Sequence, residues 1–260
     1  MTEVSEHTKN EANFNLLHIP TFEEETVLDD TQCDLNRFIT PGSALRLCQR
    51  IATNHCNTIG MNDDFYAGTH TAWIATKLGL SWKRIPKAGE RLLVRTTLEE
   101  FKKAQVKRII EFIDDSGTPI GIADTRWVVV DTATWKILRT PPAAYEQLNF
   151  QDAVDMELPL DIPRGLQGEY STTRTAAYTM CDLNKHVNNT FYADISCDAL
   201  PTEAFTNAAV QSIVVHFRRE ISYGTTFDVL RLQQDDGTWF VQGVQQEKPC
   251  FSALLRLQEI

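Results

Sequence analysis

The chain has 260 residues, 42% of them apolar and 23% charged, with a formal net charge of −10. This profile is typical of a globular protein with room for one large domain or two ordinary ones, and its acidity argues against a general nucleic-acid binder. No apolar run approaches the roughly eighteen residues of a membrane-spanning helix, and residues 1–13 lack the layout of a signal peptide. We therefore expect a cytoplasmic protein with a flexible lead over residues 1–13 and no membrane span.

The first half of the chain reads as one helix followed by a run of strands. A short strand over 24–28 is followed by the loop sequence Cys33-Asp34-Leu35-Asn36. A helix is expected over 42–57, where apolar residues recur at helical spacing. Four runs rich in strand-forming residues complete this half, at 73–80, 91–99, 107–113 and 120–131.

The second half has the same layout. A strand over 168–178 leads into a second C-D-L-N loop, and a helix is expected over roughly 188–200. Between the halves, residues 141–163 contain four prolines and no strong period, which is typical of a connector. The expected units are therefore 14–140 and 164–260. The remaining strands of the second unit are expected at 209–219, 226–233, 239–246 and 251–257.

Internal sequence matches indicate that the two halves are copies of one unit. The element at 33–36 recurs at 181–184, and Trp82-Lys83-Arg84 recurs as Phe217-Arg218-Arg219. Turn sequences at 114–117 and 235–237 form a third match in the same order. One helix followed by an antiparallel sheet in each copy predicts an α+β fold in which the sheet wraps around the helix.

The densest polar stretch of the chain lies between a strand and the start of the second helix. Within it Asp182, Asn184 and His186 alternate, so in extended geometry their side chains share one side. A lone histidine is more often structural, but His186 stands beside a carboxylate and two amides at a helix start, which favours catalysis.

The same stretch predicts a site for negative charge. Backbone N–H groups at a helix start lack intrahelical partners, and the helix dipole adds positive charge there. We expect these groups to stabilise an oxyanion on a carbonyl carbon. The residues concerned are Val187, Asn188 and Asn189. The two asparagines are equally well explained as turn and cap residues.

The first copy lacks the histidine. Phe38 stands where the second copy has His186, and Thr40 stands where it has Asn188. The loop is therefore built without a histidine in one half. We expect one active site per chain, in the second half.

At this point the sequence resembles a known family. Residues 182–189, Asp-Leu-Asn-Lys-His-Val-Asn-Asn, resemble the D-x-N-x-H-V-N-N motif of acyl-ACP thioesterases, the plant and bacterial enzymes that end fatty-acid synthesis. Residues 215–220 resemble the family's segment ending in R-R-E, and the first half fits at 53–55, 73–78 and 127–130. The resemblance implies a tandem, or double, hotdog fold. It also implies hydrolysis of the thioester between a fatty acyl chain and acyl carrier protein (ACP).

The resemblance assigns roles to four residues of this chain. Asp182, Asn184, His186 and Glu220 become the catalytic group. Plant relatives have a cysteine directly after the glutamate, whereas this chain has Ile221, so we expect direct attack by water. Glu220 and His186 would position and deprotonate that water, and which of them is the working base stays open. Asn184 would hold the water or the thioester oxygen, while Asp182 would orient its neighbours.

The resemblance further implies that the first half binds the acyl chain between its helix and sheet. Ile51, Ile59, Trp73 and Ile74 are the candidates for lining that tunnel, although core packing is the commoner role for any one of them. The expected partner is ACP, which carries the acyl chain on a phosphopantetheine arm. The chain is expected to act as a monomer or a homodimer.

Cysteine and histidine patterns call for no metal and no cofactor. The six cysteines form no C-x-x-C pair, and none stands at metal-ligand spacing from a histidine. In apolar surroundings a reduced thiol behaves as a small hydrophobic side chain. We therefore treat the cysteines as structural.

Two other classes of protein stay open at this stage. One is another hotdog enzyme, either an acyl-CoA thioesterase or a dehydratase whose histidine acts on the carbons beside the thioester. The other is a non-catalytic sensor of acyl thioesters, because fold alone does not assign chemistry. A sensor would not need the polar set around His186, and it would usually carry an additional DNA-binding or partner domain.

Overall fold

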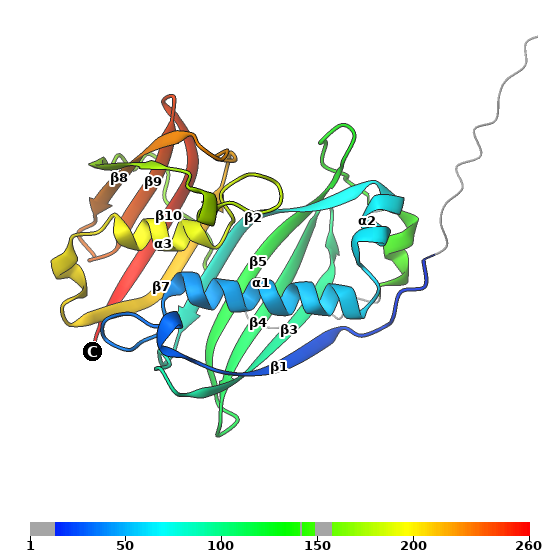
Figure 1. Cartoon of the computed structure of the whole chain (residues 1–260), viewed down its shortest axis with the longest axis horizontal. Coiled ribbons are helices and arrows are strands. Elements are labelled where there is room, and N and C mark those ends of the chain that lie inside the picture. The colour runs from blue at the N-terminus through cyan, green and yellow to red at the C-terminus, as the bar shows by residue number, and fades with distance from the viewer. Residues whose placement is uncertain (1–13, 141, 149–157) are drawn as a thin grey trace, which may run out of the picture.

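One antiparallel sheet organises the molecule (Figure 1). The computed structural model describes residues 14–140, 142–148 and 158–260. The first half contributes β1 (Thr21–Val27), β2 (Thr71–Trp82), β3 (Arg91–Lys102), β4 (Gln105–Asp114) and β5 (Pro119–Asp131). The second contributes β6 (Glu169–Thr175), β7 (Ala208–Phe217), β8 (Thr226–Gln233), β9 (Trp239–Gln245) and β10 (Lys248–Glu259). The helices are α1 (Pro41–Thr58), α2 (Asp63–Thr69) and α3 (Phe191–Asp198).

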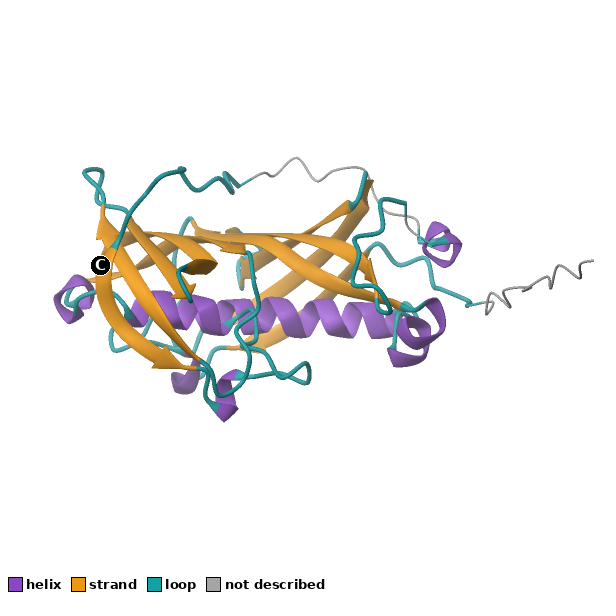
Figure 2. Ribbon diagram, turned by 90° about the horizontal axis from the view of Figure 1, so that it is seen from above, coloured by secondary structure: helices purple, strands orange, loops and turns teal. Residues whose placement is uncertain are grey.

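The two halves have the same strand topology. The sheet runs β1-β3-β4-β5-β2 and continues β7-β10-β9-β8-β6, so the second half repeats the first in reverse spatial order. The halves meet where β2 pairs antiparallel with β7, from Lys77 opposite His216 to Ser81 opposite Ser212. Each expected strand is present, and the predicted double hotdog is confirmed. Figure 2 shows the sheet curving around α1.

One of the three sequence matches does not join equivalent positions of the two copies. The turn after Asp114 joins β4 to β5, whereas the turn at Asp236 joins β8 to β9, so the two turns are not equivalent. Both are built by an aspartate that accepts a backbone hydrogen bond two residues on, at 3.0 Å from Ser116 and from Thr238. Hairpin turns favour this chemistry wherever they occur. The similarity therefore reflects turn geometry, not duplication.

The helices differ more between the halves than the strands do. Thr40 caps α1 by accepting from Ser43 N, and Pro41 occupies the first helical turn, so the helix starts firmly and runs for 18 residues. Helix α3 has 8 residues and begins at Phe191, later than expected. Helix α2 was not expected from the sequence, although Asn62 caps it by accepting from Phe65 N at 3.1 Å.

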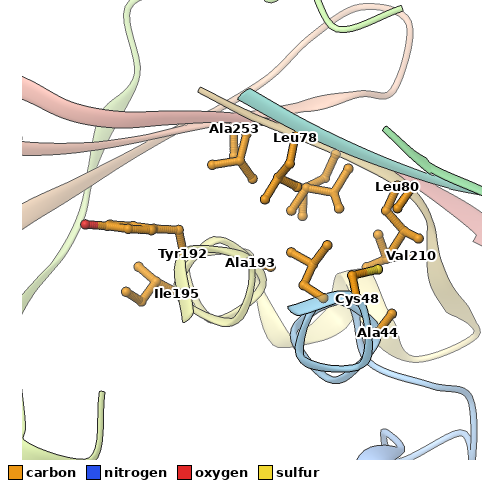
Figure 3. Close-up of a cluster of buried hydrophobic side chains, with 14 of the residues drawn as sticks. Ala44, Cys48, Leu78, Leu80, Tyr192, Ala193, Ile195, Val210 and Ala253 are labelled. Atoms are coloured by element: carbon orange, nitrogen blue, oxygen red, sulfur yellow. The ribbon is translucent and has the colours of Figure 1, made fainter. Parts of the chain in front are cut away.

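The main hydrophobic core spans both halves. Helices α1 and α3 lie side by side beneath β2, β7 and β10, and their apolar side chains meet there (Figure 3). The helices approach so closely that a Cβ on Gly42 would overlap the Asp194 carboxylate. Arg46 Nη1 lies 2.7 Å from Asp194 Oδ2 and ties the two helices together. The halves are thus joined by a shared sheet, a shared core and an ion pair.

A second apolar cluster closes the far end of the first half. Its aromatic members include Phe65 and Tyr145, whose rings make an edge contact at 5.1 Å. Tyr145 lies in the expected connector, is 1% exposed, and bonds Thr71 Oγ1 at 2.8 Å. The described parts of the connector therefore contribute to the core. Residues 1–13, 141 and 149–157, which include the expected lead, lie outside the described residues.

His55 on α1 is fully buried and held as the neutral imidazole. Its Nδ1 accepts from Arg108 Nη1 at 2.9 Å, and its Nε2–H donates to Ile19 O at 2.7 Å. Both bonds require a neutral ring with the proton on Nε2. Burial, and then the charge of Arg108, lower the pKa of His55 to about 4.

Candidate active site

The loop at residues 181–188 closes on itself. Asp182 N donates to His186 O at 3.0 Å, and Lys185 N donates to Asp182 O at 2.9 Å. Asp182 Oδ1 accepts from Asn184 N at 2.8 Å, and Lys185 has a φ of 63°, which the tight turn requires. Asp182 and His186 therefore lie opposite each other, at the base of the loop where its two sides are hydrogen-bonded.

Glu220 reaches the loop from the end of β7. Glu220 Oε2 lies 3.3 Å from His186 Nδ1, with side-chain exposures of 65% and 31%. A β-bridge between His186 and Ser222 holds the two segments together. Glu220 makes no ion pair with Arg218 or Arg219 among the described residues, so the surface ion-pair explanation of this carboxylate is not supported.

This contact has a definite chemical consequence. A carboxylate beside Nδ1 favours the tautomer with the proton on Nδ1, and it leaves the lone pair on Nε2. An imidazole held in this way can take a proton from water at Nε2. Ile221, directly after the glutamate, is fully buried, so the position that carries a cysteine in plant relatives is packed into the core here.

A groove of about 460 Å³ connects the loop to the first half. Asp182 and Asn188 line one side, while Arg46, Arg50 and Asn54 of α1 belong to the other. Of the expected site residues, Asp182 and Asn188 thus face a polar side of the first helix, whereas His186 and Glu220 are not among the lining residues of this groove. Asn184 lies at the exposed tip of the loop, and its side chain has no hydrogen-bond partner among the described residues.

The expected oxyanion donors need correction. The N–H of Val187 donates to Ile221 O and that of Asn188 donates to Met180 O, each at 2.9 Å. These two groups are already used to hold the loop against its neighbours, because α3 starts only at Phe191. The N–H of Asn189 donates to no acceptor in the part of the chain that the structure describes. Asn189 is therefore the one remaining candidate of the three.

Asn188 has a side chain of fixed orientation. Its Oδ1 accepts from Thr190 N at 3.0 Å and from Thr190 Oγ1 at 2.8 Å. Because the backbone N–H of Thr190 can only donate, the amide oxygen of Asn188 must face it, and its NH₂ group faces the other way. The expectation that an asparagine here builds the helix start is consistent with these bonds.

The cysteines near the site are poor nucleophiles. Cys181 lines the groove, and burial together with the charge of Asp182 raises the pKa of its thiol. Burial raises the pKa of the Cys197 thiol even further. Thiols with raised pKa values are largely protonated at neutral pH and react slowly. All six cysteines are free thiols.

The four candidate tunnel residues do not gather in one place. Ile51 belongs to the main core, whereas Ile59 and Trp73 belong to the cluster at the far end of the first half. Ile74 is 39% exposed. Trp73 and Ile74 are neighbours on β2, so they face opposite sides of the sheet, and both cannot line one tunnel. Ile74 is therefore removed from the candidates.

Fold and site together define a double hotdog protein in which the described residues form one histidine–carboxylate pair, placed in the second half. Family models for the N-terminal and C-terminal domains of acyl-ACP thioesterases match residues 21–148 and 169–252. The chain belongs to the acyl-ACP thioesterase family.

Curated relatives are remote in sequence. Oleoyl-acyl carrier protein thioesterase 1, chloroplastic, of Arabidopsis thaliana is 22% identical over 228 residues, which cover 81% of this chain. The oleoyl-acyl carrier protein thioesterase of Coriandrum sativum is 20% identical over 240 residues. The chain spans 63% of the length of each of these two relatives.

Solved structures share the fold over nearly the whole chain. The 12:0-ACP thioesterase from Umbellularia californica superposes with a TM-score of 0.84 at 17% identity, covering 94% of this chain and 99% of that one. An acyl-ACP thioesterase from Bacteroides thetaiotaomicron gives 0.83 at 18% identity, covering 92% and 98%. Among the described residues, no helix is long and apolar enough to cross a membrane.

Proposed function

We propose that this protein hydrolyses the thioester of fatty acyl-ACP, releasing a free fatty acid and ACP and so ending chain elongation. The observation that carries the proposal is the 3.3 Å contact between His186 Nδ1, on the loop that also carries Asp182, and Glu220 Oε2, just after β7. Family membership supports the reaction class. The raised pKa of the Cys181 thiol, which keeps it mostly protonated, supports a mechanism without a cysteine nucleophile.

In this mechanism His186 is the working base and Glu220 orients it. Nε2 of His186 takes a proton from water as the water oxygen attacks the thioester carbonyl carbon. The tetrahedral intermediate then collapses, the C–S bond breaks, and the proton on Nε2 passes to the departing thiolate. Glu220 stabilises the imidazolium formed in the first step, as the third member of a triad does.

The remaining polar residues position the reactants. The free N–H of Asn189 supports a role as oxyanion donor, a kind of contact typically worth roughly 3 kcal/mol in the transition state. Asn184, whose side chain is unengaged within the described residues, would hold the water or the thioester oxygen. Asp182 lines the groove and would orient these neighbours.

Substrate binding would use both halves. The groove against α1 would admit the phosphopantetheine arm, and the acyl chain would lie between the helix and sheet of the first half. Ile51, Ile59 and Trp73 remain candidates for contacting it. Each methylene transferred from water to such a site contributes about 0.8 kcal/mol. Activity in the cytoplasm, as a monomer or a homodimer, stays a prediction from the sequence.

The test is release of free thiol from a panel of acyl-ACPs of different chain lengths, with wild type and His186→Ala side by side. Rapid hydrolysis that is lost in the variant supports the proposal. The same acyl groups on CoA measure the preference for ACP. Hydration of an enoyl thioester without thiol release would instead favour the dehydratase, and acyl binding without turnover would favour the sensor.

A further inference from the structure

Three exposed cations surround the histidine–carboxylate contact. Lys185 directly precedes His186, and Arg218 and Arg219 directly precede Glu220, so the 3.3 Å contact brings the two segments that carry these cations together. None of the three has a carboxylate within 4.0 Å among the described residues. The chain as a whole carries −10, whereas the segments that meet here hold these three cations beside two carboxylates, Asp182 and Glu220.

The first half provides an internal comparison, because two of its three equivalent cations are ion-paired, whereas Lys83, which matches Arg218, has no carboxylate within 4.0 Å among the described residues. Arg37 matches Lys185, and its Nη2 lies 3.8 Å from Asp30. Arg84 matches Arg219, and it bonds Glu90 at 2.7 Å and Asp114 at 3.1 Å.

Both pairs of cations hold the same structural position. The N–H groups of Lys83 and Arg84 share the Ile120 carbonyl, and those of Arg218 and Arg219 share the Cys250 carbonyl. The backbone is therefore alike in the two copies. The two copies differ in the acidic residues that lie near these cations.

The acids are absent from the second copy at the matching positions. Tyr178 stands where the first copy has Asp30, and Thr225 stands where it has Glu90. The two positions that hold ion-paired cations in the first copy, Arg37 and Arg84, thus hold cations without an internal partner in the second, Lys185 and Arg219. The end where they are unpaired is the one that carries His186 and Glu220.

Large apolar side chains are exposed on the same face. Leu183 at the loop tip is 100% exposed, Tyr178 is 81% exposed and Tyr223 is 56% exposed. The centroids of the two tyrosine rings lie 6.4 Å apart in an edge-to-face arrangement, and Tyr223 N donates to Lys185 O at 2.9 Å. Tyrosine and arginine are the residue types that protein interfaces concentrate. In the first copy Asp30 and Ala88 replace the two tyrosines.

We propose that this face, formed by Lys185, Arg218, Arg219, Tyr178, Leu183 and Tyr223, docks an acidic protein surface, that of the carrier protein which delivers the acyl chain. The inference rests on the proposed function and adds to it the residues that receive the partner. Net charges of the same sign would slow encounter of this chain with an acidic partner. A local cluster of opposite sign at the site steers the encounter and fixes its orientation.

The test uses a ratio: kcat/KM for an acyl-ACP divided by kcat/KM for the same acyl group on N-acetylcysteamine, which lacks both phosphate and protein. In the full chain, Arg218→Glu with Arg219→Glu should lower this ratio at least about tenfold at low ionic strength, mainly through KM. Because Thr225→Glu supplies the acid of the first copy without removing a cation, it should lower the ratio several-fold. Both effects should shrink as salt is raised.

The matched control is an exposed dibasic pair of the first half, at the end of β3. Lys102→Glu with Lys103→Glu makes the same change in net charge on the first half and should leave the ratio at its wild-type value. An unchanged ratio in the Arg218/Arg219 variant, with wild-type hydrolysis intact, would overturn the docking proposal alone. An equal loss with acyl-CoA would also overturn it, because the cations would then bind the phosphate of the arm. Absence of hydrolysis in wild type would instead reject the proposed function.

Discussion

The loop at 33–40 and the loop at 181–188 share a backbone and differ in chemistry. In both, the aspartate N–H donates to the carbonyl four residues on, and the aspartate Oδ1 accepts from the asparagine N–H two residues on. Arg37 and Lys185 have φ angles of 67° and 63°, and both loops carry a cysteine β-bridge. The loop backbone that holds the candidate site in the second copy is therefore also present in the first copy.

Two substitutions remove the histidine–carboxylate pair from the first copy. Phe38 replaces His186, and Ile85 stands at the position that matches Glu220. In the first copy Lys87 lies over the Phe38 ring at 4.6 Å, so an apolar and cation–π contact takes the place of the histidine–carboxylate pair. Each of the two differences can be tested by exchanging residues between the copies.

The largest expected effect comes from exchanging the aromatic residues. His186→Phe gives the second loop the residue of the first, and it should lower kcat on acyl-ACP about 10³-fold, because the proposed base is gone. The thermal unfolding midpoint should change little, since the first loop shows that phenylalanine fits this frame. The reciprocal Phe38→His should leave kcat at its wild-type value. Retention of substantial activity in His186→Phe would show that the histidine is not the base.

The next effect tests the second difference. Glu220→Gln keeps the shape of the side chain but removes the charge that stabilises the imidazolium, and a loss of about 10²-fold in kcat is expected. Glu220→Ile, the residue of the first copy, should lose at least as much. The measurement is single-turnover hydrolysis, which isolates the chemical step. A larger loss from Glu220→Gln than from His186→Phe would reverse the roles and make Glu220 the base.

Much of this architecture could be predicted from the sequence, because periodicity and a repeat are local signals. The C-D-L-N match located both loops, and alternation located the strands. Asp182 and His186 were expected from the polar stretch before a helix start, and Glu220 from motif resemblance, yet the contact between His186 and Glu220 depends on a β-bridge that no local pattern reveals.

Other features could not be read in the same way. The sequence could not show that the backbone N–H groups of Val187 and Asn188 are already hydrogen-bonded, because this depends on where α3 starts. Burial of Arg108 at 4% exposed was also missed, since a dibasic sequence is normally a surface feature. The inclusion of Ile74 was an avoidable error, because adjacent strand residues face opposite sides.

The two halves also differ in the burial of a histidine: His55 of the first half is fully buried, whereas His186 of the second half is partly exposed. His55 has a pKa of about 4 in the folded protein, below its ordinary value of 6.5, because burial and Arg108 disfavour its charged form. Between these values the unfolded chain binds a proton that the folded chain does not. The free energy of unfolding should therefore fall as pH falls from about 6.5 to about 4, by up to about 3 kcal/mol from this residue.

Urea unfolding at several pH values measures this contribution. His55→Gln removes the titrating ring, so its destabilisation relative to wild type should be larger at pH 7 than at pH 4.5. Ile51→Val, a core change without a titrating group, serves as the control and should cost about 1 kcal/mol at both pH values. An equal loss from His55→Gln at the two pH values would contradict the inferred proton linkage.

The smallest expected effect separates the two loop asparagines. Asn36 Nδ2 donates to Phe205 O at 2.9 Å and to Ala208 O at 3.3 Å, so it fastens the first loop to the second half. Asn36→Ala should lower the free energy of unfolding by about 1–2 kcal/mol and leave turnover unchanged. Asn184→Ala should do the reverse, reducing kcat while changing stability by less than about 0.5 kcal/mol, because its side chain has no partner among the described residues. If both variants lost stability and neither lost activity, Asn184 would be a second structural clamp, and the division between a structural and a chemical copy would then rest on His186 and Glu220 alone.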